Sequence, residues 1–106
     1  MAQLNYVSVS VKIHTIFSGG IPANTDREIF VRSGESFDHA VEVKELSGKV
    51  ALGYWWTLPT YSHSFRETFT FLRVEKPQDD DIQVRGTTIG GANSDMEIVI
   101  HVIYPA

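Results

Sequence analysis

The sequence predicts an all-β protein, a single antiparallel sandwich domain over residues 1–106 with about seven strands, immunoglobulin-like or jelly-roll in type. Three observations support this prediction. The chain of 106 residues has the length of one domain. Apolar and polar residues alternate with the period of two that is typical of strands. Turn-forming residues recur about every ten residues, a spacing found in sandwiches and small barrels.

The N-terminal half contains the most regular alternation. Valine and isoleucine occupy the odd positions over residues 7–13, with serine and lysine between them, which predicts a half-buried strand. Residues 18–26 are rich in turn formers and predict a long loop. A helical turn near residues 42–46 is expected to be short because Ser47 and Gly48 end it. The strands expected in this half span residues 6–17, 28–32 and 37–43.

The central run Val50–Pro59, with the sequence VALGYWWTLP, places both tryptophans next to each other. Its apolar residues alternate from Val50 to Leu58, so the whole run is expected to be one strand. Neighbouring residues of a strand point to opposite faces, so Trp55 and Trp56 must point opposite ways. We expect Trp56 to pack in the core. Trp55 then needs a second layer, a partner or water, and its environment is the best clue to function.

The C-terminal half ends in a strongly apolar strand. Both faces of residues 96–104 are largely apolar, so we expect this strand to be central and buried on both sides. The first and last strands are long enough to lie at the centre together, and we expect them to pair. Residues 75–81 are predicted as an acidic loop, and residues 86–95 as a glycine-rich loop. The strands expected in this half span residues 65–74, 82–85 and 96–104.

The composition narrows the classes of function. Nine basic and thirteen acidic residues give a net charge of −4, and the basic ones are scattered, which argues against nucleic-acid binding. The absence of cysteine excludes disulfides and a cysteine nucleophile. No segment approaches the roughly 18–20 apolar residues of a membrane span. We therefore expect a soluble protein, cytoplasmic as given or secreted if a leader has been removed.

No residue pattern indicates catalysis or metal binding. The run Asp79–Asp81 is expected to be a solvated loop, because adjacent acidic side chains diverge. None of the serines lies in a Gly-x-Ser-x-Gly elbow. We therefore expect no enzyme, metal or cofactor, and a small hydrolase without a visible motif is only the third hypothesis. The histidines, which lack metal-ligand spacing, are His14, His39, His63 and His101.

Aromatic residues near the central run and the glycine-rich loop supply candidates for a binding surface. Tyrosine and tryptophan combine an apolar ring with a polar atom, which suits stacking on sugars or anchoring a protein. Glycine and asparagine supply positive φ angles in a hairpin loop. We predict a non-enzymatic recognition or assembly module that binds a protein or glycan partner, or that self-associates as a homo-oligomer. The candidate site residues are Tyr54, Trp55, Tyr61, His63, Gly90, Gly91 and Asn93.

The segment Gly53-Tyr54-Trp55-Trp56 resembles the Gly-aromatic-x-Trp element of the chagasin-type cysteine-peptidase inhibitors. Residues 29–37 are similar to the strand and Gly-Glu turn that precede this element in the family. Gly90-Gly91 and Tyr104-Pro105 resemble its glycine-rich loop and aromatic-proline tip. The resemblance implies an immunoglobulin-like domain that plugs a papain-like cleft with three loops, so peptidase inhibition is the alternative function. The family's Asn-Pro-Thr-Thr run is replaced here by residues 49–52, and only residues 92–104 separate the glycine pair from Pro105.

Overall fold

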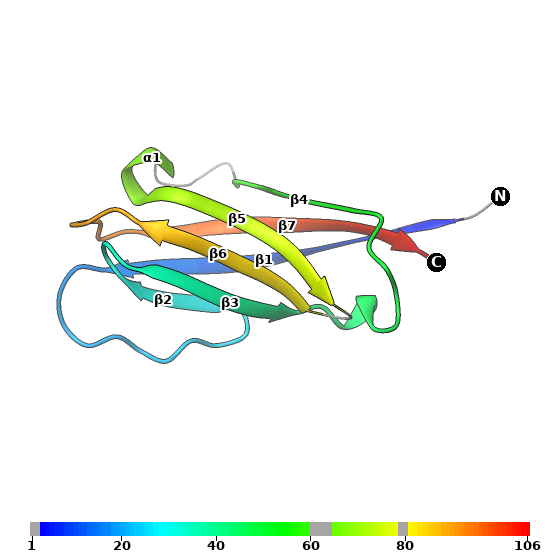
Figure 1. The fold of residues 1–106 in the computed structure, drawn as a ribbon, viewed down its shortest axis with the longest axis horizontal. Coiled ribbons are helices and arrows are strands. Elements are labelled where there is room, and N and C mark those ends of the chain that lie inside the picture. Colours follow the sequence, from blue (N-terminus) through cyan, green and yellow to red (C-terminus); the bar gives the residue numbers. More distant parts are fainter. Residues whose placement is uncertain (1–2, 60–64, 79–80) are drawn as a thin grey trace.

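The computed structural model describes residues 3–59, 65–78 and 81–106, and it confirms the predicted all-β sandwich (Figure 1). The strands are β1 (Leu4–Ile16), β2 (Glu28–Arg32), β3 (Ser36–Glu42), β4 (Gly53–Thr57), β5 (Phe69–Gln78), β6 (Asp81–Thr88) and β7 (Asp95–Pro105). Two short helical turns complete the fold, the 3-10 turn η1 (Lys44–Leu46) and α1 (Phe65–Thr68). No helix in the described ranges is long and apolar enough to cross a membrane.

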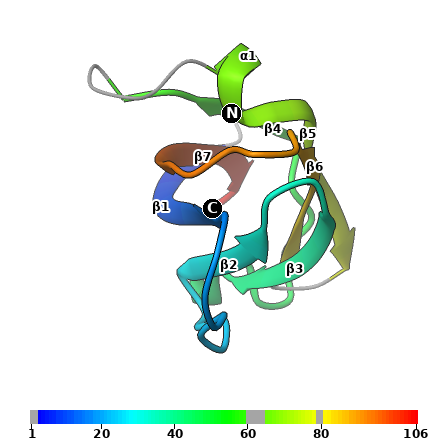
Figure 2. The same cartoon turned by 90° about the vertical axis from the view of Figure 1, so that its left-hand side faces the viewer.

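Two sheets form the two layers of the sandwich. The four-stranded sheet has the order β2-β1-β7-β4, and the three-stranded sheet has the order β3-β6-β5. Figure 2 shows the layers side by side, with β2 close to β3 at one edge and β4 close to β5 at the other. Within residues 3–59, 65–78 and 81–106, no further layer covers the outer face of either sheet.

The first and last strands pair at the centre of the four-stranded sheet, as predicted. β1 runs antiparallel to β7 from the Leu4–Pro105 pair to the His14–Asp95 pair. β3 pairs with β6 in the other sheet, and this nested pairing is typical of a jelly roll rather than of the strand order in immunoglobulin domains. β1 and β2 are the one parallel pair in this sheet, and parallel neighbours need a long crossover. The predicted loop at residues 18–26 supplies that crossover (Figure 1).

The core lies between the two sheets and contains alternate residues of the strands. Trp56 packs against this core, as predicted. Leu46 of η1 is fully buried and closes one end, so the helical turn expected near residues 42–46 has a packing role. The largest fully buried side chains are Phe69, Ile13, Ile29, Leu46, Ile82, Met96, Ile98 and Ile100.

The central strand is shorter than the sequence predicts. β4 begins at Gly53 rather than at Val50, and both Val50 and Leu52 are strongly exposed. Only Gly53–Thr57 align with partners on β7. Before that range, the Leu52 N–H still donates to the Ile103 carbonyl and Ala51 packs against the core, but the side chains of Val50 and Leu52 stay exposed. The alternation from Val50 to Leu58 therefore does not describe one continuous strand.

The face of β5 also differs from the prediction. The chain forms the turn α1 before β5 starts, and a register shift against β6 lies between Phe69 and Phe71. Strict alternation over the strand expected at residues 65–74 puts Phe69 and Phe71 on one face. Phe69 is 2% exposed, however, whereas Phe71 is 42% exposed. An irregularity of this kind puts an extra residue into one strand and reverses which side chains face inward beyond it. Leu72 and Val74 consequently take the inward positions.

Three further boundaries and burials were predicted wrongly. Much of the expected acidic loop at residues 75–81 belongs to the β5–β6 hairpin, since β5 extends to Gln78 and β6 begins at Asp81. Residues 86–88 of the expected glycine-rich loop belong to β6. β7 is buried on one face only, because the sandwich has two layers and nothing in the described chain covers its outer side.

At Gly86 the backbone of β6 lies very close to the Phe37 ring and to the backbone of β5. A Cβ atom at this position would lie 2.8 Å from the ring of Phe37 and 2.9 Å from the carbonyl oxygen of Phe71. We expect Gly86→Ala to lower the free energy of unfolding by about 1–3 kcal/mol. The Phe71 carbonyl oxygen is a backbone atom, so it cannot move away from the new methyl group unless the strand shifts with it. Gly90→Ala is the control, since a Cβ there meets nothing within 4 Å. Equal urea midpoints for the two variants would contradict the prediction.

Candidate functional site

Three neighbouring strands carry aromatic side chains on the outer face of the four-stranded sheet. His101 of β7 lies opposite Trp55 of β4 and opposite Ser8 of β1, and Tyr6 is two residues before Ser8. Residues paired across strands share a face, and the neighbours of His101 on β7 are buried, so His101 and Trp55 point outward. We call Tyr6, His101 and Trp55 the aromatic row.

His101 holds the aromatic row together. Its ring is 5.2 Å from the Trp55 ring between centroids, and the two planes differ by 10°, which is an offset stack. The Tyr6 hydroxyl is hydrogen-bonded to His101 Nδ1 at 2.6 Å, and the Thr57 hydroxyl to Nε2 at 2.6 Å. A neutral imidazole has one donor and one acceptor nitrogen, and each hydroxyl can take either role, so both contacts are satisfied. These contacts therefore hold the three rings in a defined arrangement.

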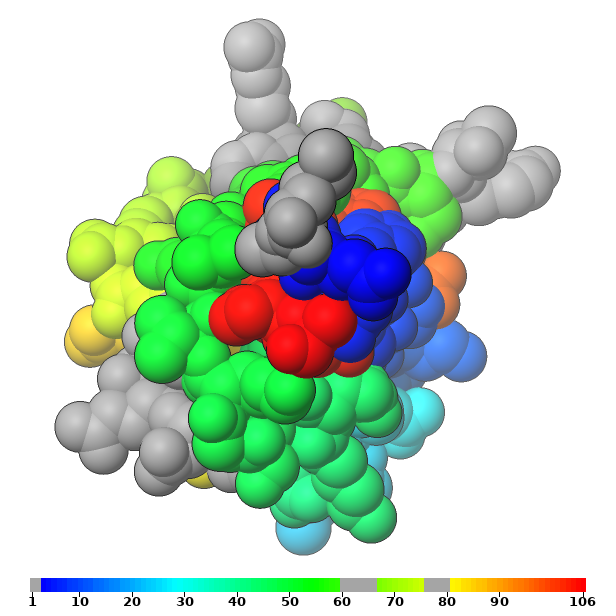
Figure 3. Space-filling model, turned by 90° about the vertical axis from the view of Figure 1, so that its right-hand side faces the viewer, coloured from blue at the N-terminus to red at the C-terminus, as the bar shows by residue number. Residues whose placement is uncertain are grey.

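The aromatic row is exposed, and its surroundings combine apolar side chains with the uncharged hydroxyls of Ser8 and Thr57. Tyr6 is 56% exposed and Trp55 is 44% exposed, while Ile103 beside them is half-buried. The described outer-face residues of β1 from Leu4 to Ser10 carry no formal charge, and the first charged pair along the β1–β7 ladder is Lys12 with Glu97. Figure 3 looks onto the end of the molecule where this uncharged region begins, with the ends of β1 (blue) and β7 (red) side by side.

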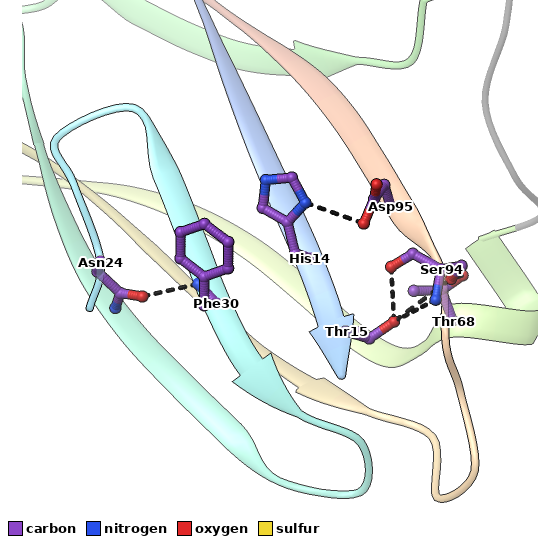
Figure 4. Close-up of polar contacts among 7 residues, drawn as sticks. All are labelled: His14, Thr15, Asn24, Phe30, Thr68, Ser94 and Asp95. Carbon is purple, nitrogen blue, oxygen red and sulfur yellow. Dashed lines mark hydrogen bonds and ion pairs between the residues drawn. The ribbon is translucent and has the colours of Figure 1, made fainter. Parts of the chain in front are cut away.

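A second polar cluster lies at the other end of the same sheet (Figure 4). His14 Nδ1 is 2.9 Å from Asp95 Oδ1, and the His14 ring stacks on Phe30 with centroids 4.5 Å apart. His14 Nε2 is buried and has no hydrogen-bond partner among the described residues. The backbone N–H of Phe30 donates to Asn24 Oδ1 at 2.7 Å and ties the crossover loop to β2. This cluster joins the edge strand β2 to the β1–β7 pair.

The His14–Asp95 pair lacks the nucleophile that a hydrolase needs. Ser94 is the nearest serine in sequence, but its hydroxyl is 3.1 Å from the Thr68 hydroxyl and 3.4 Å from the Thr15 hydroxyl. Figure 4 shows the second imidazole nitrogen directed away from Ser94. Acyl transfer requires the nucleophile and the base within hydrogen-bond reach of each other. Ser94 and His14 are therefore not arranged as a nucleophile and its base.

The structure separates the residues that the sequence grouped into one site. Trp55 lies in the aromatic row, whereas Tyr54 is paired with the buried Val102 and points to the opposite face of β4. The loop with Gly90, Gly91 and Asn93 precedes β7, roughly 20 Å from His101 at the rise of a β-strand. Gly91 has φ +87°, as expected for its turn. Tyr61 and His63 lie outside the described residues.

The elements that resemble the peptidase inhibitors do not gather at one end. Gly90-Gly91 precedes β7, and Tyr104-Pro105 forms the other end of this single strand. The Gly53–Trp56 segment is paired strand rather than a loop. A wedge of three loops needs its loops side by side, so this geometry does not favour the inhibitor function.

Sequence reasoning missed Tyr6, Thr57 and His101. Tyr6 occupies an even position among the polar residues of the first strand, which was a signal that it faces outward. His101 was assigned to a strand buried on both sides, so its exposure was not expected. Their contacts depend on the pairing of β1, β7 and β4, and local alternation does not define which strands are neighbours.

Neither the comparisons with known proteins nor the positions of possible metal ligands identify a function for the chain. No group of three or more histidine or acidic side chains in the described part of the chain is placed to hold a metal ion. The chain matches no protein-family model, no curated protein and no solved structure, so its function has to be argued from the geometry of its surfaces.

Proposed function

We propose that this protein is a non-enzymatic recognition module that binds a protein partner through the aromatic row. One observation carries the proposal: Tyr6 and Trp55 are exposed, yet both are held in place by His101. Large exposed aromatic side chains on a monomer mark interaction surfaces more often than isolated apolar residues do.

The composition around the row supports a protein rather than a charged ligand. The cores of protein interfaces are enriched in tyrosine and tryptophan and depleted of charged residues. Leu4, Tyr6 and Ile103 give the surface this character, and the charged Lys12–Glu97 pair lies further along the ladder. Tryptophan and tyrosine are also the residues that most often contribute the largest binding energies.

The rigidity of the row supports the same conclusion. Association costs free energy when side chains lose rotamer freedom, and that cost falls when the binding geometry exists beforehand. Two hydrogen bonds and one stack already restrict His101 and the rings beside it. A rigid aromatic surface on an open sheet face is suited to a complementary protein surface of similar flatness.

The test compares Trp55→Ala with Tyr54→Ala. The two residues are adjacent and similarly exposed, at 44% and 42%, but they point to opposite faces of β4. The partner is a protein that is first identified by crosslinking to this chain and then purified. We expect Trp55→Ala to weaken its binding by about 30-fold, the effect of losing a residue that contributes about 2 kcal/mol to the binding free energy. Tyr54→Ala is expected to retain wild-type affinity.

The same two variants identify self-association. If sedimentation finds a wild-type dimer that Trp55→Ala dissociates and Tyr54→Ala does not, the protein partner is a second copy of the chain. Equal loss of affinity in both variants, with unchanged unfolding midpoints, would show that the aromatic row is not the contact surface.

A further inference from the structure

The outer face of the three-stranded sheet contains a depression of about 280 Å³. It lies on the opposite layer from the aromatic row, so it is independent of the proposed protein contact. All three strands line it: Ser36, Phe37 and Asp38 from β3, Arg85, Gly86 and Thr87 from β6, and Phe71 from β5.

Phe71 provides the exposed apolar ring of the depression, since Phe37 packs against the core. The register shift between Phe69 and Phe71 turns the second ring outward, and Phe71 remains 42% exposed. The ring is aligned with Thr87 on the neighbouring strand, whose hydroxyl is hydrogen-bonded to that of Ser36 at 2.8 Å. An apolar ring thus lies beside two hydroxyl groups on one sheet face.

Asp38 and Arg85 provide the charged groups, and these groups balance each other. Arg85 Nε is 3.5 Å from Asp38 Oδ2, and Arg85 Nη1 is 3.9 Å from Glu75 Oε2. Gln83 Nε2 donates to the other oxygen of Asp38, which fixes the carboxylate on the sheet. Both members of the Asp38–Arg85 pair are about half-exposed and therefore retain free hydrogen-bonding positions.

The charges that line the depression indicate which kind of ligand it can bind. One carboxylate and one guanidinium line the depression, so it has no net charge that would concentrate an ion. A carboxylate accepts hydrogen bonds, a guanidinium donates them, and the hydroxyls of Ser36 and Thr87 do both. A neutral molecule with adjacent hydroxyl groups matches this set, because each hydroxyl also donates and accepts.

The size of the depression restricts the ligand further. Pockets for drug-sized ligands measure about 300–1,000 Å³, so this depression accommodates one small ring rather than a larger molecule. We infer that it binds a single neutral pyranose residue, free or as part of a glycan. The apolar face of the sugar lies on Phe71, and its adjacent hydroxyls contact Asp38 and Arg85.

The experiment is a titration of the ¹⁵N-labelled protein with the methyl glycosides of glucose, galactose, mannose and N-acetylglucosamine. We expect saturable amide shifts with at least one sugar, with a dissociation constant on the order of 1 mM. The shifts should be largest at Asp38, Phe71 and Arg85. No saturable shift with any of the sugars, or shifts confined to the aromatic row, would overturn the inference.

Variants separate this site from the protein contact. Asp38→Asn keeps the size of the side chain but removes its charge, and we expect it to lower sugar affinity by about tenfold, since hydrogen bonds to charged groups are the stronger ones. Asp95→Asn is the matched control on the other sheet and is expected to leave sugar affinity unchanged. Trp55→Ala should also bind the sugar normally, so failure of either proposal leaves the other standing. Equal affinity of wild type and Asp38→Asn would contradict the assignment of Asp38.

Discussion

Replacing Phe69 with alanine is expected to lower the free energy of unfolding by about 3–5 kcal/mol, the usual cost of truncating a buried phenylalanine. Phe69 is among the largest fully buried side chains, and its ring and that of Phe37 meet edge to face with centroids 6.1 Å apart. Domains of this size have total stabilities of about 5–15 kcal/mol, so the variant loses a large part of its stability.

Phe71→Ala is the matched control, because it removes the same side chain from the same strand. We expect its unfolding free energy to stay within about 1 kcal/mol of wild type, since Phe71 lies on the outer face. Chemical denaturation of both variants, followed by far-ultraviolet circular dichroism, measures the difference. Similar losses for Phe69 and Phe71 would mean that the register shift between them is absent.

Trp56→Ala is expected to destabilise the protein by about 2–4 kcal/mol, slightly below the full cost for a buried tryptophan because Trp56 is only partly buried. Trp55→Ala should cost less than about 1 kcal/mol, because Trp55 contacts His101 on an open face. The adjacent tryptophans therefore separate into one that stabilises the fold and one that is available for binding.

Fluorescence provides an independent readout of the same separation. Trp55→Phe leaves Trp56 as the emitter, and its emission should be blue-shifted and poorly quenched by acrylamide. Trp56→Phe leaves Trp55, which should be quenched readily. Identical quenching of the two variants would contradict their placement on opposite faces of β4.

Much of the fold was predictable because local alternation reports which residues can face a core. The pairing of the first and last strands followed from their length and apolar content. The outward turn of Phe71 did not, because a register shift depends on the partner strand and not on the sequence around it. The burial of β7 was overestimated, because apolar residues on an open face of a strand give the same sequence pattern as apolar residues on a covered face.

The candidate site was predicted only in part. The adjacency of Trp55 and Trp56 required that one of them leave the core, and Trp55 is indeed exposed. His101 and Tyr6 lie far from Trp55 in sequence, and only strand pairing brings them together. The glycine-rich loop was a reasonable candidate by composition, but it lies at the other end of β7.

The pairing of Leu4 with Pro105 determines how the domain responds to mechanical load. Tension applied at these two positions pulls adjacent strands apart from one end of the sheet. The hydrogen bonds between β1 and β7 then break one after another, whereas strands loaded in shear would resist through many bonds at once. The central pair of the larger sheet, flanked by β2 and β4, is thus the first to separate when Leu4 and Pro105 are drawn apart.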